Sequence, residues 1–244
     1  GSPLLERLKD QADAIVFLDL NHIHELPDRF EAYVQMLPKH VRDDLKRRRR
    51  QASDRGVSCR ILDAEEVAAC LPRFHQLTVE ATAKHGITPL YDLRTLQAVA
   101  CAPCARVMAC SHDGDLLGGF LFFEDEDAVY VWCAALDYGK VGEFSTYVCL
   151  LFDVVSYACS RGKHRIEFGR GNYAFKLKHG FRGVPLYSLF FFTHNSTVVL
   201  ATRFDFRSSP SCVCCCSIVG AVVWFLLGAF TSPRRTIPGS VSSV

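Results

Sequence analysis

One stretch of the sequence combines the residue types of a ligand-binding turn with those of an acid–base site. It runs from Arg165 to Phe181, and an apolar strand ending in Glu167 leads there into a Gly-Arg-Gly turn at 169–171. Glycines on both sides of an arginine allow a sharp bend close to a ligand, and a guanidinium held in such a turn suits a phosphate or a carboxylate. A short helical piece carrying Tyr173 and Lys176 follows. We therefore interpret this stretch as a candidate functional site.

Hydrophobic periodicity and turn residues predict the elements that must position this stretch. Asp63 and Asp92 precede apolar-periodic segments and are expected helix N-caps. An Asp-Gly pair within 112–115 and an acidic turn at 125–127 join three successive apolar strands. Helices are expected over residues 27–55 (with a break at Pro38), 64–85, 92–100 and 144–161, and strands over 14–20, 57–62, 105–111, 116–124, 128–135, 165–168 and 185–193. This order predicts an α+β fold with a mixed, mostly antiparallel sheet flanked by helices.

The pieces around the candidate turn resemble a known family. They are, in chain order, a basic helix at 42–50, Gly56 with a strand at 57–62, a helix at 147–162, a strand at 165–168, and a Phe-Gly-Arg-Gly, aromatic-x-x-Lys and Gly-Phe signature ending at Phe181. This arrangement is similar to the FemAB-like branch of the GNAT acyltransferases and to the BioF2-like acetyltransferase-domain family. The resemblance covers roughly residues 38–192 and implies the GNAT (acyl-CoA N-acyltransferase) fold.

The resemblance implies that an amine attacks the carbonyl of an activated acyl donor directly, without a covalent enzyme intermediate. Such a protein positions the amine, accepts its proton, and stabilises the oxyanion and the leaving group. Coenzyme A is the common carrier in this class, so acyl-CoA is the expected cosubstrate and a small-molecule or peptide amine the expected acceptor. In the FemAB branch the donor is aminoacyl-tRNA, which stays open as the alternative.

Lys176 stands where the family carries a lysine that faces the acyl-transfer centre, and it is the first candidate catalytic residue. A fixed ammonium there can stabilise an oxyanion or hold an oxygen of the donor. Lys178 should face elsewhere on the same helix and serves as an internal control. Glu167, as a proton acceptor, and Tyr173, as a proton donor to the leaving group, are further catalytic candidates. The structural alternatives are a solvated lysine, a strand-end salt bridge and a packed ring.

Arg170 and Asn172 are the candidate substrate-binding residues of the same turn. Arg170 can bind a carboxylate or phosphate through two parallel hydrogen bonds. It can equally pair with Glu167 or Glu143 and lock the local structure.

The loop at 137–145 is the candidate donor-binding segment, because a helix N-terminus with glycine amides can bind a pyrophosphate. Its candidate residues are Gly139, Lys140, Gly142 and Ser145. The loop departs from the family's usual glycine-rich pattern and carries the acidic Glu143. A plain strand-to-helix connection is the alternative interpretation.

Lys46 to Arg50 are five consecutive basic residues on a predicted helix. They lie all around that helix, so only one or two can face a single partner. Transfer RNA, a coenzyme phosphate, anionic lipid and solvent are the candidate partners. The net charge of +2 argues against nucleic-acid binding over the whole surface, and no DNA binding is expected.

The cysteines and histidines of the sequence predict neither a metal site nor a redox centre. Twelve cysteines are scattered through helices and strands without a disulfide framework, which indicates buried thiols in a reducing compartment. Cys101 and Cys104 have the spacing of a redox pair, but no matching strand precedes them, and only Cys110 and His112 lie near enough for a zinc set. No metal site is expected, and no Gly-x-Ser-x-Gly elbow is present.

Residues 201–244 differ in composition from the rest of the chain. No charge occurs from Ser208 to Pro233, and residues 212–230 are nearly continuously apolar, just long enough to cross a bilayer. A cysteine cluster at 212–216 suits acylation beside a membrane. A membrane anchor, an unrelated tail and a buried hairpin are the three interpretations.

We therefore expect three parts in the chain: a leader or remnant of an upstream GNAT-like subdomain at 1–37, the acyltransferase domain at 38–200, and the apolar Cys-rich tail at 201–244. The predicted function is N-acyl transfer from acyl-CoA to an amine in the cytoplasm, with membrane association through 212–230 as an option. An aminoacyl-tRNA-dependent transferase and a non-catalytic module that binds a polyanion or membrane are the alternatives.

Overall fold

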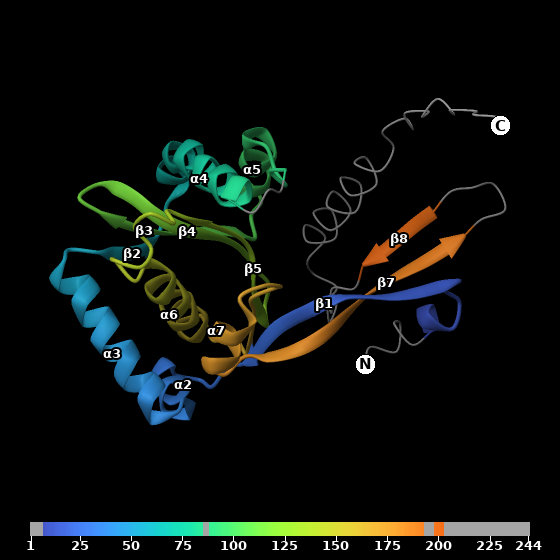
Figure 1. Ribbon diagram of the computed structural model, residues 1–244, viewed down its shortest axis with the longest axis horizontal. Helices are drawn as coiled ribbons and strands as arrows, with labels where there is room; N and C mark the ends of the chain where they lie inside the picture. The colour runs from blue at the N-terminus through green and yellow to red at the C-terminus, as the bar shows by residue number, and fades with distance from the viewer. Residues whose placement is uncertain (1–6, 85–87, 193–197, 203–244) are drawn as a thin grey trace, which may run out of the picture. The chain divides into compact units, whose positions relative to one another are not determined.

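The computed structural model describes residues 7–84, 88–192 and 198–202. The chain divides into two compact units, one of residues 17–186 and one of residues 1–16 together with 187–244. The larger unit contains the candidate turn and the elements around it (Figure 1).

The strands follow one another along the sheet in the order β2-β3-β4-β5-β6-β1-β7-β8. Their bounds are β1 Ala14–Glu25, β2 Ser58–Ile61, β3 Ala105–His112, β4 Asp115–Glu124, β5 Ala128–Leu136, β6 Arg165–Glu167, β7 Arg182–Phe192 and β8 Val198–Thr202. Strands β2 to β5 pair antiparallel, β5 and β6 pair parallel, and β6 pairs antiparallel with β1. This mixed, mostly antiparallel sheet with helices confirms the predicted α+β class.

The helices also lie close to their predicted positions. They are α2 Phe30–Met36, α3 Lys39–Asp54, α4 Ala64–Lys84, α5 Leu93–Ala100, α6 Thr146–Ser160 and α7 Tyr173–Lys178. Pro38 separates α2 from α3, as expected of a residue that cannot donate a helical hydrogen bond. Asp92 caps α5 by accepting a hydrogen bond from the Thr95 amide at 2.7 Å, which confirms the predicted N-cap.

The predicted turns are confirmed by their backbone geometry. Asp113 and Gly114 both have positive φ, at 50° and 84°, which is the two-residue hairpin turn that an Asp-Gly pair favours. In the second turn the Asp125 amide donates to the Ala128 carbonyl at 3.1 Å, and the Asp125 side chain accepts from the Asp127 amide at 2.9 Å.

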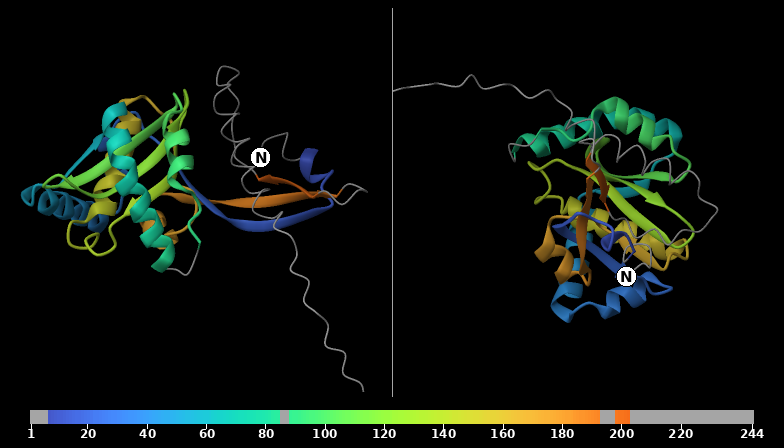
Figure 2. Two further views of the ribbon diagram at one scale, coloured as in Figure 1. Left: turned by 90° about the horizontal axis from the view of Figure 1, so that it is seen from above. Right: turned by 90° about the vertical axis from the view of Figure 1, so that its right-hand side faces the viewer.

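Two helical layers cover the sheet of the larger unit. Helices α4 and α5 lie on one face, and in the right-hand view of Figure 2 the yellow helix α6 lies on the other side of the green strands. Each layer has its own apolar core. Leu121 and Phe74 belong to the α4–α5 side, whereas Phe120, Phe122 and Ile166 pack on the α6 side.

Strand β5 changes the faces of its side chains part-way along. Phe122 pairs with Val131 and Leu121 with Cys133, so Trp132 is an extra residue with no partner on β4. Val129 and Val131 belong to the core on the α6 side, whereas Cys133 packs on the α4–α5 side. A β-bulge with one extra residue reverses the alternation of all residues that follow it.

In the smaller unit, β7 and β8 pair antiparallel from Ser188 opposite Thr202 to Phe192 opposite Val198. The Asp13 amide donates to the Phe190 carbonyl at 2.9 Å. Strand β8 was not predicted from the sequence. Strand β1 contains the predicted strand at 14–20 and extends beyond it, whereas β7 begins before the predicted start at 185 and ends at Phe192.

No helix in the described ranges is long and apolar enough to span a bilayer. The candidate membrane segment at 212–230 and its cysteine cluster lie outside the described residues.

Replacing Gly118 of β4 with alanine should destabilise the fold, because the added Cβ would lie 2.7 Å from the Ala135 carbonyl oxygen and 3.1 Å from Thr146 Cγ2. We expect the free energy of unfolding, measured by urea denaturation, to fall by about 1–3 kcal/mol. Gly142→Ala is the control, since a Cβ at Gly142 meets nothing within 4 Å. Equal stability of the two variants would contradict this packing.

Candidate active site

A pocket of about 610 Å³ opens where β5 and the chain after β6 part from each other. The parallel pairing of these strands ends at Tyr130 opposite Glu167. Beyond that point β5 runs on to Leu136, while the other chain bends into the turn at 168–171. Residues of β5, this turn, α7, the loop before α6, the first turn of α6, and α3 line the pocket.

The turn after β6 adopts a backbone that requires its glycines. Gly169 has φ of 61° and Gly171 of 73°, in the left-handed region that a side chain disfavours. Phe168 anchors the turn in the core, with its ring centroid 5.6 Å from that of Phe120 and 5.0 Å from that of Phe181. The Gly-Arg-Gly spacing in the sequence therefore corresponds to a tight turn at the pocket wall, with Arg170 among the lining residues.

Lys176 holds this turn from the inside. Its Nζ donates to the carbonyl oxygens of Phe168 at 2.7 Å, Gly169 at 3.2 Å and Arg170 at 2.8 Å. The side chain lines the pocket, although the residue is only 2 % exposed. An ammonium has three N–H donors, so all three are engaged by the backbone. Burial lowers the pKa of Lys176 to about 8, while the three carbonyl acceptors favour the protonated form.

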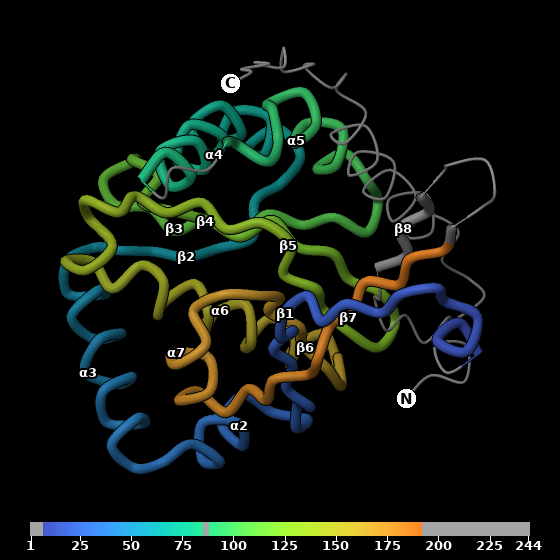
Figure 3. The backbone as a smooth tube through the Cα atoms, turned by 45° about the vertical axis from the view of Figure 1, so that its right-hand side comes forward, coloured from blue at the N-terminus to red at the C-terminus, as the bar shows by residue number. Residues whose placement is uncertain are grey.

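His22 of β1 holds the same turn from the other side. Its backbone amide donates to the Gly169 carbonyl at 3.0 Å, its ring Nδ1 lies 3.1 Å from the same oxygen, and its carbonyl accepts from the Phe168 amide at 2.7 Å. Figure 3 shows how α7 and β1 come together beside β6. The turn is therefore fastened to two elements that are far apart in the sequence.

The bulge of β5 supplies the opposite wall of the pocket. Val131, Trp132, Ala134 and Leu136 all line it. Strand β6 ends at Glu167, so Trp132 faces no partner residue on either neighbouring strand. The N–H of such an extra residue can donate to the oxygen of a bound carbonyl group.

Part of the predicted donor loop also reaches the pocket. Gly142 and Ser145 line it, whereas Gly139 and Lys140 do not. Lys140 instead lies 3.7 Å from Asp115, and the amide of Gly139 donates to the Asp137 side chain at 3.0 Å.

The first turn of α6 presents unbonded amides to the same space. Tyr147 and Val148 line the pocket, and no acceptor among the described residues pairs with their backbone N–H groups. Free amides at a helix N-terminus favour an anionic ligand. Glu143, the acidic residue of this loop, does not line the pocket, and its carbonyl accepts a hydrogen bond from Arg55.

The charged side chains that line the pocket are all cationic. They are Arg48, Arg170 and Lys176, and no carboxylate of the described residues is among the lining groups. Arg48 pairs with Asp44 at 3.0 Å, and Arg170 lies 3.8 Å from Asp19. The pocket is therefore suited to a ligand that carries negative charge.

Two predicted site residues, Glu167 and Tyr173, lie beside the pocket and do not line it, whereas Asn172 and Arg170 do. Glu167 is buried, with one carboxylate oxygen 3.3 Å from Arg165 Nε and the other accepting from Asn21 at 2.7 Å. The Tyr173 hydroxyl donates to Asp19 at 2.5 Å. Asn172 lines the pocket and forms the left-handed N-cap of α7. Arg170 pairs with Asp19, a partner that differs from both acids considered from the sequence.

Three residues of this region could not be singled out from sequence. Asp19 and His22 lie on β1, about 150 positions before the turn that they contact, and Trp132 acquires its role from a bulge. The one sequence signal for Asp19 is a lone acid within an apolar strand.

The described cysteines, eight in number, are all free thiols. Cys101 is exposed and Cys104 buried, and no group of three or more His, Cys, Asp or Glu side chains in the described part of the chain is arranged to hold a metal ion.

The mixed sheet, in which β5 and β6 are parallel and α6 packs on one face, is the fold of a GNAT-type acyltransferase. The chain belongs to the family described as acetyltransferase (GNAT) domain, which matches residues 39–177, more than half of its length. It is therefore an acyltransferase of this class, as its sequence predicted.

Solved structures of low sequence identity share the fold. FemX matches with a TM-score of 0.58 and 13% identity, over 75% of this chain and 66% of that one. The C-terminal domain of a putative lysylphosphatidylglycerol synthetase from Agrobacterium fabrum matches with a TM-score of 0.57 and 11% identity, over 93% and 68%. L-PGS from Bacillus licheniformis matches with 0.54 and 11%, over 91% and 69%.

The chain thus spans about two thirds of the length of these neighbours, and the likeness, consistent with the FemAB-like branch, concerns the fold. No functionally curated protein matches it in sequence.

Lys176→Ala should lower acyl transfer by at least about tenfold, roughly 1.4 kcal/mol of barrier, because the turn loses three hydrogen bonds. Lys178→Ala is the matched control, since its Nζ lies 3.9 Å from Asp44 and does not line the pocket. The measurement is kcat/KM for both variants. Equal loss in the two variants, or loss in neither, would contradict a role for Lys176 at the site.

The ratio of kcat/KM between the wild type and Lys176→Met should decrease as pH rises through about 8, because the neutral amine of Lys176 keeps only two of its three N–H donors. Stability should not fall in the same window. A lysine whose folded-state pKa lies below the unfolded value binds fewer protons when folded, so its contribution to the unfolding free energy rises with pH between about 8 and 10.5. The ratio of kcat/KM between the two proteins and their urea midpoints, measured from pH 6.5 to 10, check both statements. A ratio that stays constant with pH would refute the first.

Proposed function

We propose that this protein transfers an acyl group from acyl-CoA to an amine by direct attack within the pocket beside β5. One observation carries the proposal: the pocket joins a β-bulge to the N-terminus of α6 and has three cationic side chains and no carboxylate in its described lining. An acyl thioester with a phosphate-bearing carrier matches both ends of such a pocket.

The residues at the α6 end suit the phosphate groups of the carrier. The unbonded amides of Tyr147 and Val148 point to an anion at this position, and Arg48 adds a guanidinium from α3. Gly142 and Ser145 bring further backbone close to the same place. These groups would hold the carrier by charge and hydrogen bonds, while the carrier supplies the activated thioester.

The residues at the bulge suit the reacting carbonyl. The N–H of Trp132 can donate to the oxygen on which negative charge develops. Lys176 would act here by fixing the turn that forms the facing wall, since its own N–H donors are already engaged. Glu167 and Tyr173 stay candidates for proton transfer, and Arg170 with Asn172 for substrate binding.

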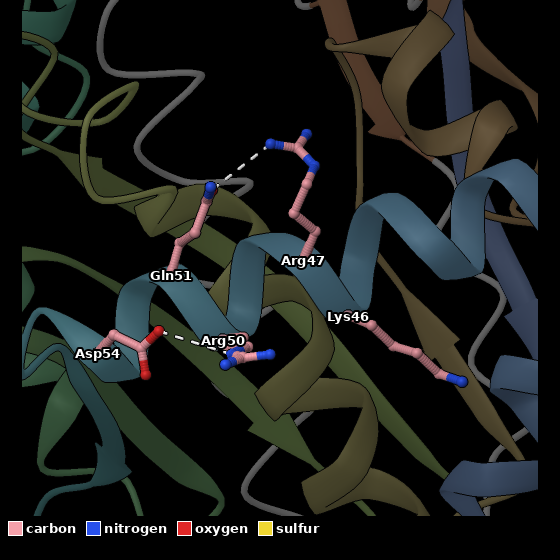
Figure 4. Close-up of a pocket in the computed structure, with 5 residues that line it drawn as sticks. All are labelled: Lys46, Arg47, Arg50, Gln51 and Asp54. Atoms are coloured by element: carbon pink, nitrogen blue, oxygen red, sulfur yellow. Dashed lines mark hydrogen bonds and ion pairs between the residues drawn. The ribbon is translucent and has the colours of Figure 1, made fainter.

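A second candidate function, aminoacyl transfer from a charged tRNA, is favoured by the outer face of α3. Figure 4 shows Lys46, Arg47 and Arg50 lining a surface hollow of this helix together with Gln51 and Asp54. The same helix carries Arg48, which lines the donor pocket. A phosphate backbone on the outer face would therefore lie near the entrance for its acyl group.

We also propose that the acyltransferase domain extends from residue 38 to residue 200. The protein would be located in the cytoplasm, and residues 212–230 would contact a membrane. A non-catalytic module that binds polyanions or membranes is the outcome left if no donor binds.

Thermal unfolding of the whole chain with coenzyme A, acetyl-CoA and a charged tRNA, each titrated alone, tests the donor. A ligand that binds only the folded state stabilises it by RT ln(1 + [L]/Kd), and we expect a rise in Tm with acetyl-CoA. A shift with charged tRNA alone would favour the second function, and no shift with any donor would overturn both.

If tRNA binds, the double variant Arg47→Gln/Arg50→Gln should weaken binding and reduce the slope of log K against log salt by about 1 for each lost phosphate contact. Lys84→Gln/Arg94→Gln, on α4 and α5, removes the same charge from another surface and is the control. The same slope in both double variants would show that α3 does not contact the phosphates.

A further inference from the structure

The carbonyl oxygen of Gly169, in the turn at the pocket wall, receives three N–H donors. They are the backbone amide of His22 at 3.0 Å, the ring Nδ1 of His22 at 3.1 Å and Lys176 Nζ at 3.2 Å. A carbonyl oxygen has two lone pairs, so three donors crowd this acceptor. The imidazole of His22 and the ammonium of Lys176 therefore meet at one atom of the turn.

This hydrogen bond fixes the protonation state of the His22 ring. A carbonyl group can only accept, so Nδ1 carries a proton and donates it to Gly169. In the neutral ring Nε2 then has a lone pair, and this atom is buried without a hydrogen-bond partner among the described residues. Protonation would convert it into an N–H group that has no acceptor, in a side chain that is fully buried.

Titratable groups of three neighbouring elements surround the His22 ring. From β1, from β6 with its turn, and from α7, they are Asp19, Glu167, Arg170, Tyr173 and Lys176. Burial lowers the pKa of His22 and outweighs the Gly169 hydrogen bond, which raises it. The charge of Lys176 lowers this pKa further, whereas that of Asp19 raises it. His22 is therefore mostly neutral at pH 7.

His24, two residues further along β1, offers a comparison within the same strand. Its Nδ1 donates to the Gly180 carbonyl at 2.7 Å, and its Nε2 is likewise buried without a partner among the described residues. Burial lowers its pKa as well, but the charge that acts on it is that of Glu25, which raises the pKa. His24 thus holds the far end of α7, whereas His22 faces an ammonium at the pocket turn.

We propose that His22 is a positioning residue that must be neutral for the turn to keep its shape, and that acid opens the turn by charging this ring. Two cations at one carbonyl oxygen repel each other, and the new N–H on Nε2 lacks an acceptor. Opening of the turn gives both groups access to water. Phe168 and Arg170 of this turn line the pocket, so opening also weakens binding of the acyl donor, a consequence that rests on the function proposed above.

The direction of the pH dependence follows from the lowered pKa of His22. A histidine whose folded-state pKa lies below its unfolded value of 6.5 binds fewer protons when folded. Its contribution to the free energy of unfolding therefore becomes unfavourable as pH falls below 6.5. The turn should accordingly be closed at pH 7.5 and open progressively in acid.

Hydrogen exchange of the Phe168 amide, followed by NMR on the whole chain, tests the proposal without a ligand. This amide donates to the His22 carbonyl at 2.7 Å, so it reports whether the turn is closed. Between pH 7.5 and 5.5 its protection, corrected for the intrinsic exchange rate, should fall by at least about tenfold in the wild type and less than about threefold in His22→Asn. The asparagine amide can donate to Gly169 from the position of Nδ1 but takes up no proton.

His24→Asn is the matched control, because it removes an equally buried imidazole that bonds a carbonyl at the other end of α7. At Phe168 it should respond to acid as the wild type does. Equal loss of protection in the wild type and His22→Asn, no loss in the wild type, or preservation by His24→Asn instead would overturn the proposal.

A titration of the His22 ring nitrogens, followed by their chemical shifts, gives a test that does not need a substituted His22. Removing the ammonium with Lys176→Met should raise the midpoint of this titration by at least about 0.5 pH unit, since a like charge is lost. An unchanged midpoint would refute the coupling of the two groups.

Binding of acetyl-CoA, measured by equilibrium dialysis at the same two pH values, tests the consequence for the site. Acid should raise Kd by at least about tenfold in the wild type and less than about threefold in His22→Asn. The same change in both proteins would contradict control of donor binding by His22. Loss of Phe168 protection as expected, without acetyl-CoA binding at either pH, would support the role of His22 in the turn and refute the proposed function instead.

Discussion

The site depends on one buried ammonium placed inside a bend of the backbone. Three consecutive carbonyl groups of the turn point at Lys176 Nζ. Carbonyl dipoles that converge in this way would repel one another, and removal of the ammonium would leave the carbonyls of Phe168 and Arg170 without a donor, while that of Gly169 keeps the His22 amide. The glycines make the bend sterically accessible, and the lysine makes it stable. The position of Arg170 and the width of the pocket beside β5 both follow from this arrangement.

The turn also connects parts of the larger unit that are distant in sequence. His22 of β1 and Lys176 of α7 both hydrogen-bond to the turn, and the Phe168 ring packs in the core on the α6 side. Lys178, two residues after Lys176, pairs with Asp44 of α3, which also pairs with Arg48. The charged wall of the pocket is therefore tied to the same short helix that holds the turn.

Local signals made most of the fold predictable from the sequence. The Asp-Gly hairpin, the Asp92 cap and the break at Pro38 each act over a few residues, and each is found where expected. The Gly-Arg-Gly turn and its lysine were likewise visible as a motif. The roles of Asp19 and His22 were not, because they arise from pairing between β1 and β6. Partners that differ by about 150 positions leave no periodic pattern in a single sequence, and β8 lacked a clear turn signal before it.

After the bulge at Trp132, different residues of β5 line the ligand pocket and pack against the helices on the other face of the sheet. After it, Ala134 and Leu136 face the pocket while Cys133 and Ala135 pack beneath α4 and α5. Adjacent positions therefore contribute to different properties of the molecule. Substitutions at Ala134 and Leu136 can therefore change substrate preference, while Cys133 and Ala135 preserve the packing of the opposite layer. A strand of this kind allows ligand range and thermal robustness to evolve with little interference.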